Sequence, residues 1–124
     1  RYWFRRRRFN LGILLGEVVV IDVDDDSAMS WVQEHSLDST PMIAASPHGM
    51  HFYHQVQEPI RTQIKYLKLP LDIKATGYIV APPSDLDSGE SYTWLEGPVP
   101  KEQLPVVNIP KDPSNLVPNT WHEN

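Results

Sequence analysis

Short apolar runs, separated by glycine, proline and polar residues, dominate the hydrophobic pattern of this chain and predict a fold built mainly from strands. The expected strands are 11–15, 18–23, 42–46, 50–56, 71–74, 78–81 and 91–95. Gly16-Glu17 separates the first two runs. Glycine at the first position of a two-residue turn predicts a type II′ hairpin that pairs these two strands.

Helical periodicity is confined to two short segments. One begins at Asp26 or Ser27, either of which can cap a helix, and runs to about His35. The other is a turn or two within 60–67. From residue 97 on, six prolines in 28 residues predict a loosely packed tail or linker. The pattern therefore predicts one small α+β domain, with a mostly antiparallel central sheet and short flanking helices.

The most informative stretch is a β-branched strand that carries two acids. The run Val19-Val20-Ile21 predicts a buried strand, and Asp22 and Asp24 stand two positions apart on one of its faces. Ionised carboxylates crowded on one face repel each other, and a hard cation such as Mg²⁺ or Mn²⁺ commonly neutralises them. The alternative is that 22–26 is only a strand end running into a helix cap.

Two later strands offer further polar groups. Alternation over 50–56 puts His51 on the face opposite Met50 and Phe52, and Asp72 and Lys74 share a face of 71–74. Three carboxylates and a histidine from separate strands are suitable for a two-metal site. In such a site one ion activates an attacking hydroxyl and the other steadies a triphosphate. The histidine and the lysine can contact the phosphates directly.

Charge is distributed unevenly along the chain. The net charge is −5, from 11 basic and 16 acidic residues. Five basic residues lie in the first eight positions, so residues 9–124 carry 6 minus 16, or −10. Such a body repels nucleic acid, so template binding needs the arginine arm, bound metal, or local basic positions. The arm positions are Arg5, Arg6, Arg7 and Arg8, and the local ones are Arg61, Lys65, Lys68 and Lys74.

The absence of cysteine excludes disulfides, a zinc ribbon and a thiol nucleophile, and it suits a cytoplasmic protein. The apolar run 11–21 is interrupted by Gly12, Gly16 and Glu17 and is too short for a membrane span. No small-residue cleavage site follows the basic start. We therefore expect no membrane partner. The first residue is arginine, which suggests a processed or excised fragment.

Several segments, taken in order, resemble one known family. They are 10–13 (Asn-Leu-Gly-Ile), 20–24 (Val-Ile-Asp-Val-Asp), 46–53 (Ser-Pro-His-Gly-Met-His-Phe-Tyr), 71–74 (Leu-Asp-Ile-Lys), 77–84 (Gly-Tyr-Ile-Val-Ala-Pro-Pro-Ser) and 89–94. Over residues 9–97 the chain resembles the primase-polymerase (prim-pol) domain of the archaeo-eukaryotic primase superfamily. The Val-Ala-Pro-Pro-Ser segment with a later glycine and Tyr-x-Trp is its most distinctive part.

The resemblance implies a catalytic core related to the RNA-recognition fold. Such a core starts or extends primers with nucleoside triphosphates and Mg²⁺ or Mn²⁺. By position, Asp22 and Asp24 match the family's paired acids and Asp72 its third acid. The family's nucleotide-binding positions fall on His51, Ser46, Gly49 and Lys74.

Two features depart from the family pattern. The small-residue turn before the family's histidine is Pro47-His48-Gly49 here, which stiffens the loop and adds an imidazole beside the phosphate site. Most of the helical region that usually precedes Asn10 is absent, so we expect an N-terminally truncated core.

We therefore predict a basic arm over 1–8, a prim-pol catalytic core over 9–97 and a Pro-rich tail or linker over 98–124. The predicted activity is template-directed nucleotidyl transfer on a single-stranded DNA template and primer, in the host cytosol if a phage or plasmid encodes the chain. Such cores are commonly fused to a helicase. One alternative is a non-catalytic module of the same fold that binds nucleotide or single-stranded DNA. Another is a metal-dependent nuclease or phosphohydrolase, in which water is the nucleophile.

Overall fold

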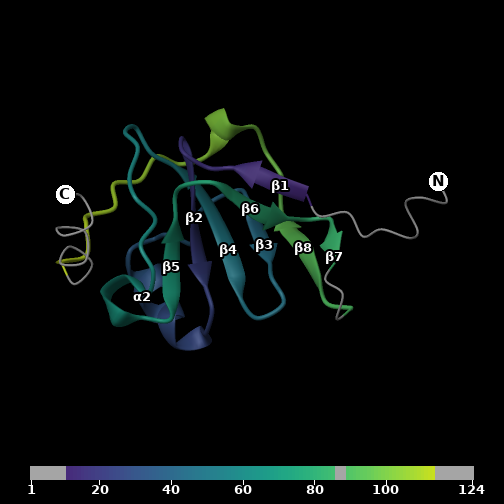
Figure 1. The fold of residues 1–124 in the computed structure, drawn as a ribbon, viewed down its shortest axis with the longest axis horizontal. Helices are drawn as coiled ribbons and strands as arrows, with labels where there is room; N and C mark the ends of the chain where they lie inside the picture. Colours follow the sequence, from purple (N-terminus) through teal and green to yellow (C-terminus); the bar gives the residue numbers. More distant parts are fainter. Residues whose placement is uncertain (1–10, 86–88, 114–124) are drawn as a thin grey trace.

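A six-stranded antiparallel sheet forms the centre of the protein in the computed structural model, which describes residues 11–85 and 89–113 (Figure 1). In spatial order its strands are β5 (Leu71–Lys74), β2 (Val18–Val23), β4 (Met50–Gln55), β3 (Ile43–Ala45), β8 (Ser91–Glu96) and β7 (Ser84–Asp85). A second sheet pairs β1 (Leu11–Leu14) with β6 (Tyr78–Ala81). The predicted α+β class with a mostly antiparallel sheet is confirmed.

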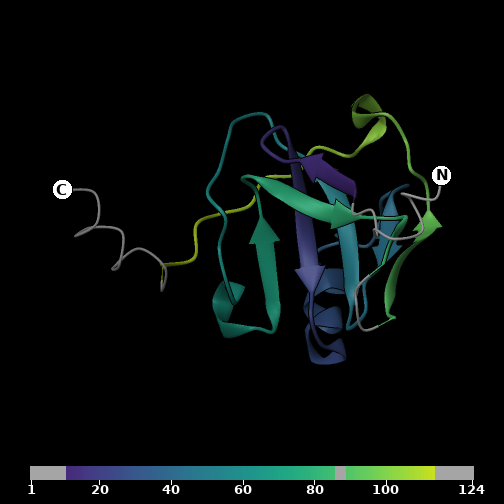
Figure 2. The same cartoon turned by 45° about the vertical axis from the view of Figure 1, so that its right-hand side comes forward.

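β2 is the most buried strand of the sheet, because its apolar side chains are covered on both faces. Val19, Val20 and Ile21 are fully buried, as expected for a β-branched strand with neighbours on both sides. β2 pairs with β4 on one side and with β5 on the other. Ile21 packs in one core cluster with residues of the helical segment, including Val32. The helix α2 (Met29–Glu34) therefore covers this face (Figure 2).

The opposite face of the sheet is covered only in part. β1 and β6 cross it near the start of β2 (Figures 1 and 2). Leu15 and Ile79 pack there against Val20, Ala44 and Tyr53 of the large sheet. The end of β2, where the two acids lie, is outside this second core. Among the described residues, β1 and β6 therefore cover only the part of this face near the start of β2.

The predicted hairpin between 11–15 and 18–23 is wrong. β1 pairs with β6, with Leu14 opposite Tyr78, and does not pair with β2. Gly16, at φ +144°, turns the chain out of the small sheet and into the large one. A local pattern marks the break at this glycine, but the pairing partner comes from much later in the chain and local turn chemistry cannot reveal it.

The helical segment after β2 is short and is capped by a residue other than those predicted. Asp25, rather than Asp26 or Ser27, is the N-cap, and its carboxylate accepts a hydrogen bond from the Ser27 N–H at 3.0 Å. A 3₁₀ turn, η1 (Asp26–Ala28), leads into α2, which ends at His35 as predicted.

The helical turns predicted within 60–67 are largely replaced by extended chain. Gln63 forms a bridge with Ile73 of β5, and a 3₁₀ turn, η2 (Tyr66–Lys68), follows it. Apolar spacing alone did not distinguish an extra strand-like contact from a helical turn. No helix within 11–85 and 89–113 has the length and apolar character needed to cross a membrane.

The chain after β8 returns along the end of β4. A 3₁₀ turn, η3 (Lys101–Gln103), comes first, and Gln55 then exchanges backbone hydrogen bonds with Pro105 and Val107, both at 2.9 Å. Leu104 and Ile109 are buried. Proline content predicted loose packing for this segment, but its apolar residues attach 98–113 to the core. Residues 114–124 lie outside the described part of the chain.

His54 is expected to make stability depend on pH. Its ring is 1% exposed, and Nε2 lies 2.7 Å from the Leu37 carbonyl oxygen. Burial lowers the pKa of His54, so the unfolded state binds this proton more readily than the folded state. The stabilisation is therefore complete above about pH 6.5 and decreases as the pH falls below that value. His54→Gln keeps a donor for Leu37 and should show a smaller loss of melting temperature on acidification. If the melting temperatures of wild type and variant fell by the same amount over this pH range, the assignment would be contradicted.

Candidate active site

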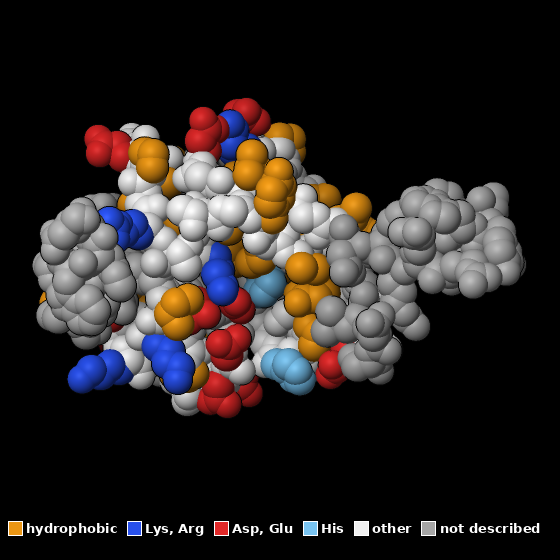
Figure 3. All heavy atoms as spheres, in the orientation of Figure 1, with side chains coloured by type: hydrophobic (Ala, Val, Ile, Leu, Met, Phe, Trp, Pro, Cys, Tyr) orange, Lys and Arg blue, Asp and Glu red, His pale blue; other side chains and the backbone are white. Residues whose placement is uncertain are grey.

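Three of the predicted site residues form one row across the sheet. Asp22 on β2 is directly opposite His51 on β4 and Asp72 on β5. Facing residues of antiparallel neighbours point to the same side, so all three lie on the face away from α2. His51 Nε2 is 3.3 Å from Asp22 Oδ1. Acidic side chains gather low in the centre of this face, with histidine and basic side chains beside them (Figure 3).

Asp24 lies just beyond the end of β2, next to this row. Its N–H donates to the Pro70 carbonyl oxygen at 2.9 Å, which extends the pairing on the β5 side. Partial burial raises the pKa of Asp24, and the negative charges of Asp22 and Asp72 raise it further. The repulsion that the sequence predicted between these acids is therefore present in the folded protein.

The capping alternative accounts for Asp25 and not for the paired acids. Asp25 accepts hydrogen bonds from Ser27, and these bonds lower the pKa of its carboxyl group. The cap contacts of η1 and α2 do not involve Asp22 or Asp24. The local secondary structure thus leaves these two acids available for another role.

Asp72 contacts a donor group with each of its oxygens. Oδ1 accepts a hydrogen bond from the Lys65 N–H at 2.7 Å, and Oδ2 lies 3.6 Å from Lys74 Nζ. Lys74 is opposite Val20 in the register, two positions from Asp72 on the same strand face. The lysine predicted to line the site is therefore at its edge.

The three carboxylates do not converge on one point in this structure. Within 11–85 and 89–113, no group of three or more acidic or histidine side chains is arranged to hold a metal ion. The expectation that Asp22, Asp24 and Asp72 meet within reach of one ion is therefore not met by these side-chain positions. The reason is that Asp72 contacts Lys65 and Lys74, while Asp22 contacts His51. The backbones of Asp22 and Asp72 are adjacent, about 4.5–5.5 Å apart at Cα in such pairs, so side-chain rotation is the movement that convergence needs.

His51 forms the inner wall of the site and is only 4% exposed. Its Nδ1 and the hydroxyl of Tyr53 are buried, and neither has a hydrogen-bond partner among the described residues. Burial, followed by the charge of Asp22, raises the pKa of Tyr53. Buried polar atoms are usually paired, so these two are suited to hold a water molecule or a ligand group.

Tyr92 is a neighbour of the site that was not among the predicted site residues. It is half-buried on β8, and its ring centroid is 5.8 Å from that of His51. Burial and the charge of Asp22 raise the pKa of its hydroxyl group. The sequence signal that could have identified Tyr92 was the alternation along β8, which puts Tyr92 and Trp94 on one face. The pattern could not show that β8 lies beside β3.

The turn between β3 and β4 packs against the end of β2. Ser46 N–H donates to the Gly49 carbonyl oxygen at 2.9 Å. A side-chain carbon at Gly49 would lie only 1.7 Å from the Val23 carbonyl oxygen and 3.3 Å from Asp24 Cα. Glycine at this position therefore allows the turn that carries Ser46 to lie next to the paired acids. His48, in the same turn, is exposed.

One predicted binding element lies outside the described residues. It consists of Arg5, Arg6, Arg7 and Arg8, so the binding of nucleic acid by this arm stays a prediction.

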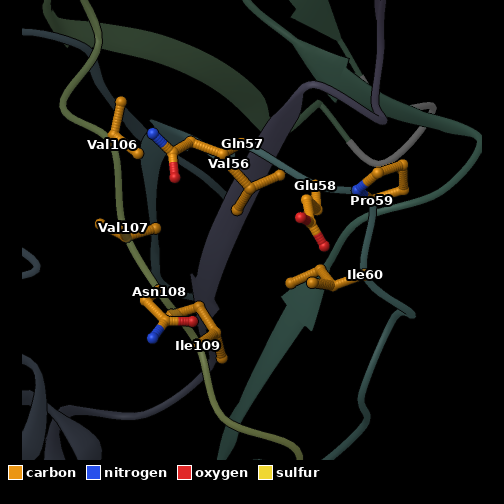
Figure 4. A pocket seen from close by; sticks show the side chains of 9 residues that line it. All are labelled: Val56, Gln57, Glu58, Pro59, Ile60, Val106, Val107, Asn108 and Ile109. Carbon is orange, nitrogen blue, oxygen red and sulfur yellow. The ribbon is translucent and has the colours of Figure 1, made fainter.

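A groove of about 470 Å³ lies away from the acidic row, between 56–60 and 106–109 (Figure 4). Its polar side chains are Gln57, Glu58 and Asn108, and its remaining lining is apolar. It contains no cation that would attract a triphosphate and none of the predicted site residues. The groove therefore does not compete with the acidic row as the candidate site.

The fold and the site together define an α+β protein with clustered acids on an open sheet face. Residues 1–111 match the model of the family described as bifunctional DNA primase/polymerase, N-terminal (Prim-Pol). The match extends over most of the chain, and the chain belongs to this family. Primase-type domains act on DNA and nucleotides by nucleotidyl transfer. Searches of curated proteins and of solved structures gave no match.

Proposed function

We propose that this chain is the catalytic core of a DNA primase/polymerase that performs template-directed nucleotidyl transfer. The observation that carries the proposal is the row Asp72-Asp22-His51 with Asp24 beside it, on the part of the sheet face that β1 and β6 do not cover. In a member of the Prim-Pol family, acids placed there are suited to hold the cations that bind the phosphates of a nucleotide.

Two divalent ions, Mg²⁺ or Mn²⁺, would be held by Asp22, Asp24 and Asp72. Carboxylate oxygens are the ligands that these hard cations prefer. Partial burial, followed by repulsion from Asp22 and Asp72, raises the pKa of Asp24, and a cation would relieve the repulsion. The residues therefore fit the ions in donor chemistry, provided that Asp72 Oδ2, the oxygen that faces Lys74, turns toward Asp22. When bound, such ions activate the attacking hydroxyl and neutralise the triphosphate.

The protein's own residues would orient the nucleotide. His51 is held by burial and by its contact with Asp22, so its ring forms a rigid wall beside the phosphates. Lys74 is about one-third exposed, and its contact with Asp72 is long at 3.6 Å. Because partly exposed ion pairs contribute little stability, Lys74 can leave Asp72 for a phosphate oxygen. Ser46 and Gly49 would line the turn beside Asp24.

An extension assay tests this proposal directly. The full chain, given a primed single-stranded template, labelled nucleotides and Mn²⁺, is expected to produce elongated products. Binding of nucleotide and template without product would indicate a non-catalytic module of the same fold. Shortening of the template would instead indicate a nuclease, because water would then be the nucleophile.

The proposal leaves several sequence predictions in place. These are the division into 1–8, 9–97 and 98–124, a helicase fused to or associated with the chain, an origin in a phage or plasmid, and a place in the cytoplasm. Each of these stays a prediction.

A further inference from the structure

Positive charge outside the arm is concentrated beside the acidic row. Four of the six basic residues of 9–124 lie within 61–74, a segment whose only acid is Asp72. They are Arg61, Lys65, Lys68 and Lys74. Within a body of net charge −10, this segment is where a polyanion is repelled least.

The middle of this segment has an unusual backbone. Lys65, Leu67 and Lys68 have φ angles of +49°, +55° and +63°. Residues with a Cβ seldom adopt this left-handed region, and here three of four successive residues do so. Strain of this kind persists only where the surrounding structure holds it, and it is concentrated at functional sites.

Contacts on both sides hold this loop in place. Asp72 Oδ1 accepts the Lys65 N–H at 2.7 Å, and Asp112 Oδ2 accepts the Leu67 N–H at 2.5 Å. Tyr66 points inward, where its ring is buried and its hydroxyl donates to the Pro110 carbonyl oxygen at 2.7 Å. Because Tyr66 is fixed in the core, its neighbours Lys65, Leu67 and Lys68 are left exposed on the surface.

We propose that the loop 65–68 binds the phosphate backbone of single-stranded nucleic acid beside the active site. This inference rests on the proposed nucleotidyl-transfer function. Within 11–85 and 89–113, neither the Lys65 nor the Lys68 ammonium group pairs with a carboxylate. Both charges are therefore available to phosphates. Ile64 and Leu67, 51% and 42% exposed, add apolar surface against which bases can pack.

Asp72 connects the loop to the candidate active site. One of its oxygens holds the Lys65 backbone and the other faces Lys74, while Asp72 itself lies opposite Asp22 in the row. A strand bound at the loop would therefore lie next to the acids. The lysines also offset the repulsion between those acids and the phosphates, which acts over roughly 10 Å at 0.1 M salt.

Binding of fluorescent oligothymidylate to the full chain tests the proposal. For single strands, each lost phosphate contact reduces the salt dependence of log K by about 0.7, which is roughly fivefold in affinity at 0.1 M salt. Lys65→Gln/Lys68→Gln should therefore weaken binding about 25-fold and reduce the slope by about 1.4. Lys65→Arg/Lys68→Arg should retain the wild-type affinity. Lys101→Gln is the matched control, because Lys101 is exposed but pairs with Glu17 elsewhere on the surface.

The outcomes separate this inference from the proposed function. An unchanged slope in the double variant, an equal loss in Lys101→Gln, or no binding by wild type would overturn the loop assignment. Weaker binding of deoxynucleoside triphosphate with Mn²⁺ but unchanged strand binding would assign the lysines to the nucleotide and also overturn it. If the double variant has a lower melting temperature than wild type, the two single variants give the same test. Failure of wild type to extend primers would contradict the proposed function. The salt dependence of strand binding would still test whether the loop binds nucleic acid.

Discussion

Replacing Asp24 by asparagine is expected to reduce nucleotide incorporation by at least about 10³-fold, because it removes one charged group at a metal-assisted phosphate site. The same variant should be as stable as wild type or slightly more stable. The pKa of Asp24 is raised in the folded state, so wild type loses stability as the pH rises through that pKa. At neutral pH asparagine removes the partly buried charge of Asp24 and its repulsion by Asp22 and Asp72. Incorporation on a primed template and melting in metal-free buffer measure the two effects.

Asp25→Asn is the matched control for this experiment. It makes the same chemical change one residue away, at the exposed N-cap, where asparagine caps about as well as aspartate. Incorporation should therefore be retained. Asp22 is a less clean position, because its removal would leave Nε2 of the buried His51 without its partner. Full activity in Asp24→Asn, or a melting temperature lower by several degrees, would contradict the assigned role.

Replacing Gly49 by alanine is expected to destabilise the protein by about 3 kcal/mol or more, at the upper end of the cost of overpacking. The added carbon would lie 1.7 Å from the Val23 carbonyl oxygen and 2.8 Å from the Val23 carbonyl carbon. Both are backbone atoms of β2, so the turn or β2 must move. A decrease in melting temperature of about 10 °C is the corresponding result. Nucleotide affinity should fall as well, because the same movement displaces Asp24.

Gly77→Ala separates this close approach from the general cost of losing a glycine. Gly77 has a φ of +76°, but no atom lies within 4 Å of a carbon added there. Only the left-handed backbone is then unfavourable, at roughly 1–2 kcal/mol. The decrease in melting temperature should therefore be clearly smaller than for Gly49→Ala. Equal decreases would contradict the assignment of the Gly49 effect to its close contact with β2.

Strand positions and faces could be predicted because they depend on local chemistry. The β-branched run 18–23 and the alternation over 50–56 and 71–74 specified which residues point the same way. The structure confirms those strands and places Asp22, His51 and Asp72 in one cross-strand row. The bridge between Gln63 and Ile73 and the packing of 98–113 were not predicted, because both depend on contacts with distant strands.

The order of strands was also beyond the local pattern. Gly16 marks a change of direction equally well for a hairpin and for a passage between two sheets. Only the position of β6, which comes much later in the chain, decides between them. The same holds for Tyr92, whose place beside His51 follows from the position of β8 next to β3.

The sequence by itself determined the fold class, the membership of candidate residues on one strand face, and the resemblance to the Prim-Pol family. The first two follow from side-chain type and from a period of two along a strand, and the resemblance depends on the order and spacing of the matched segments. Only the tertiary structure decided which side chains contact one another. It paired Asp22 with His51, held Asp72 between Lys65 and Lys74, and fixed a strained lysine loop at the edge of the acidic row. Such contacts depend on distances between residues far apart in the chain, which local periodicity does not encode.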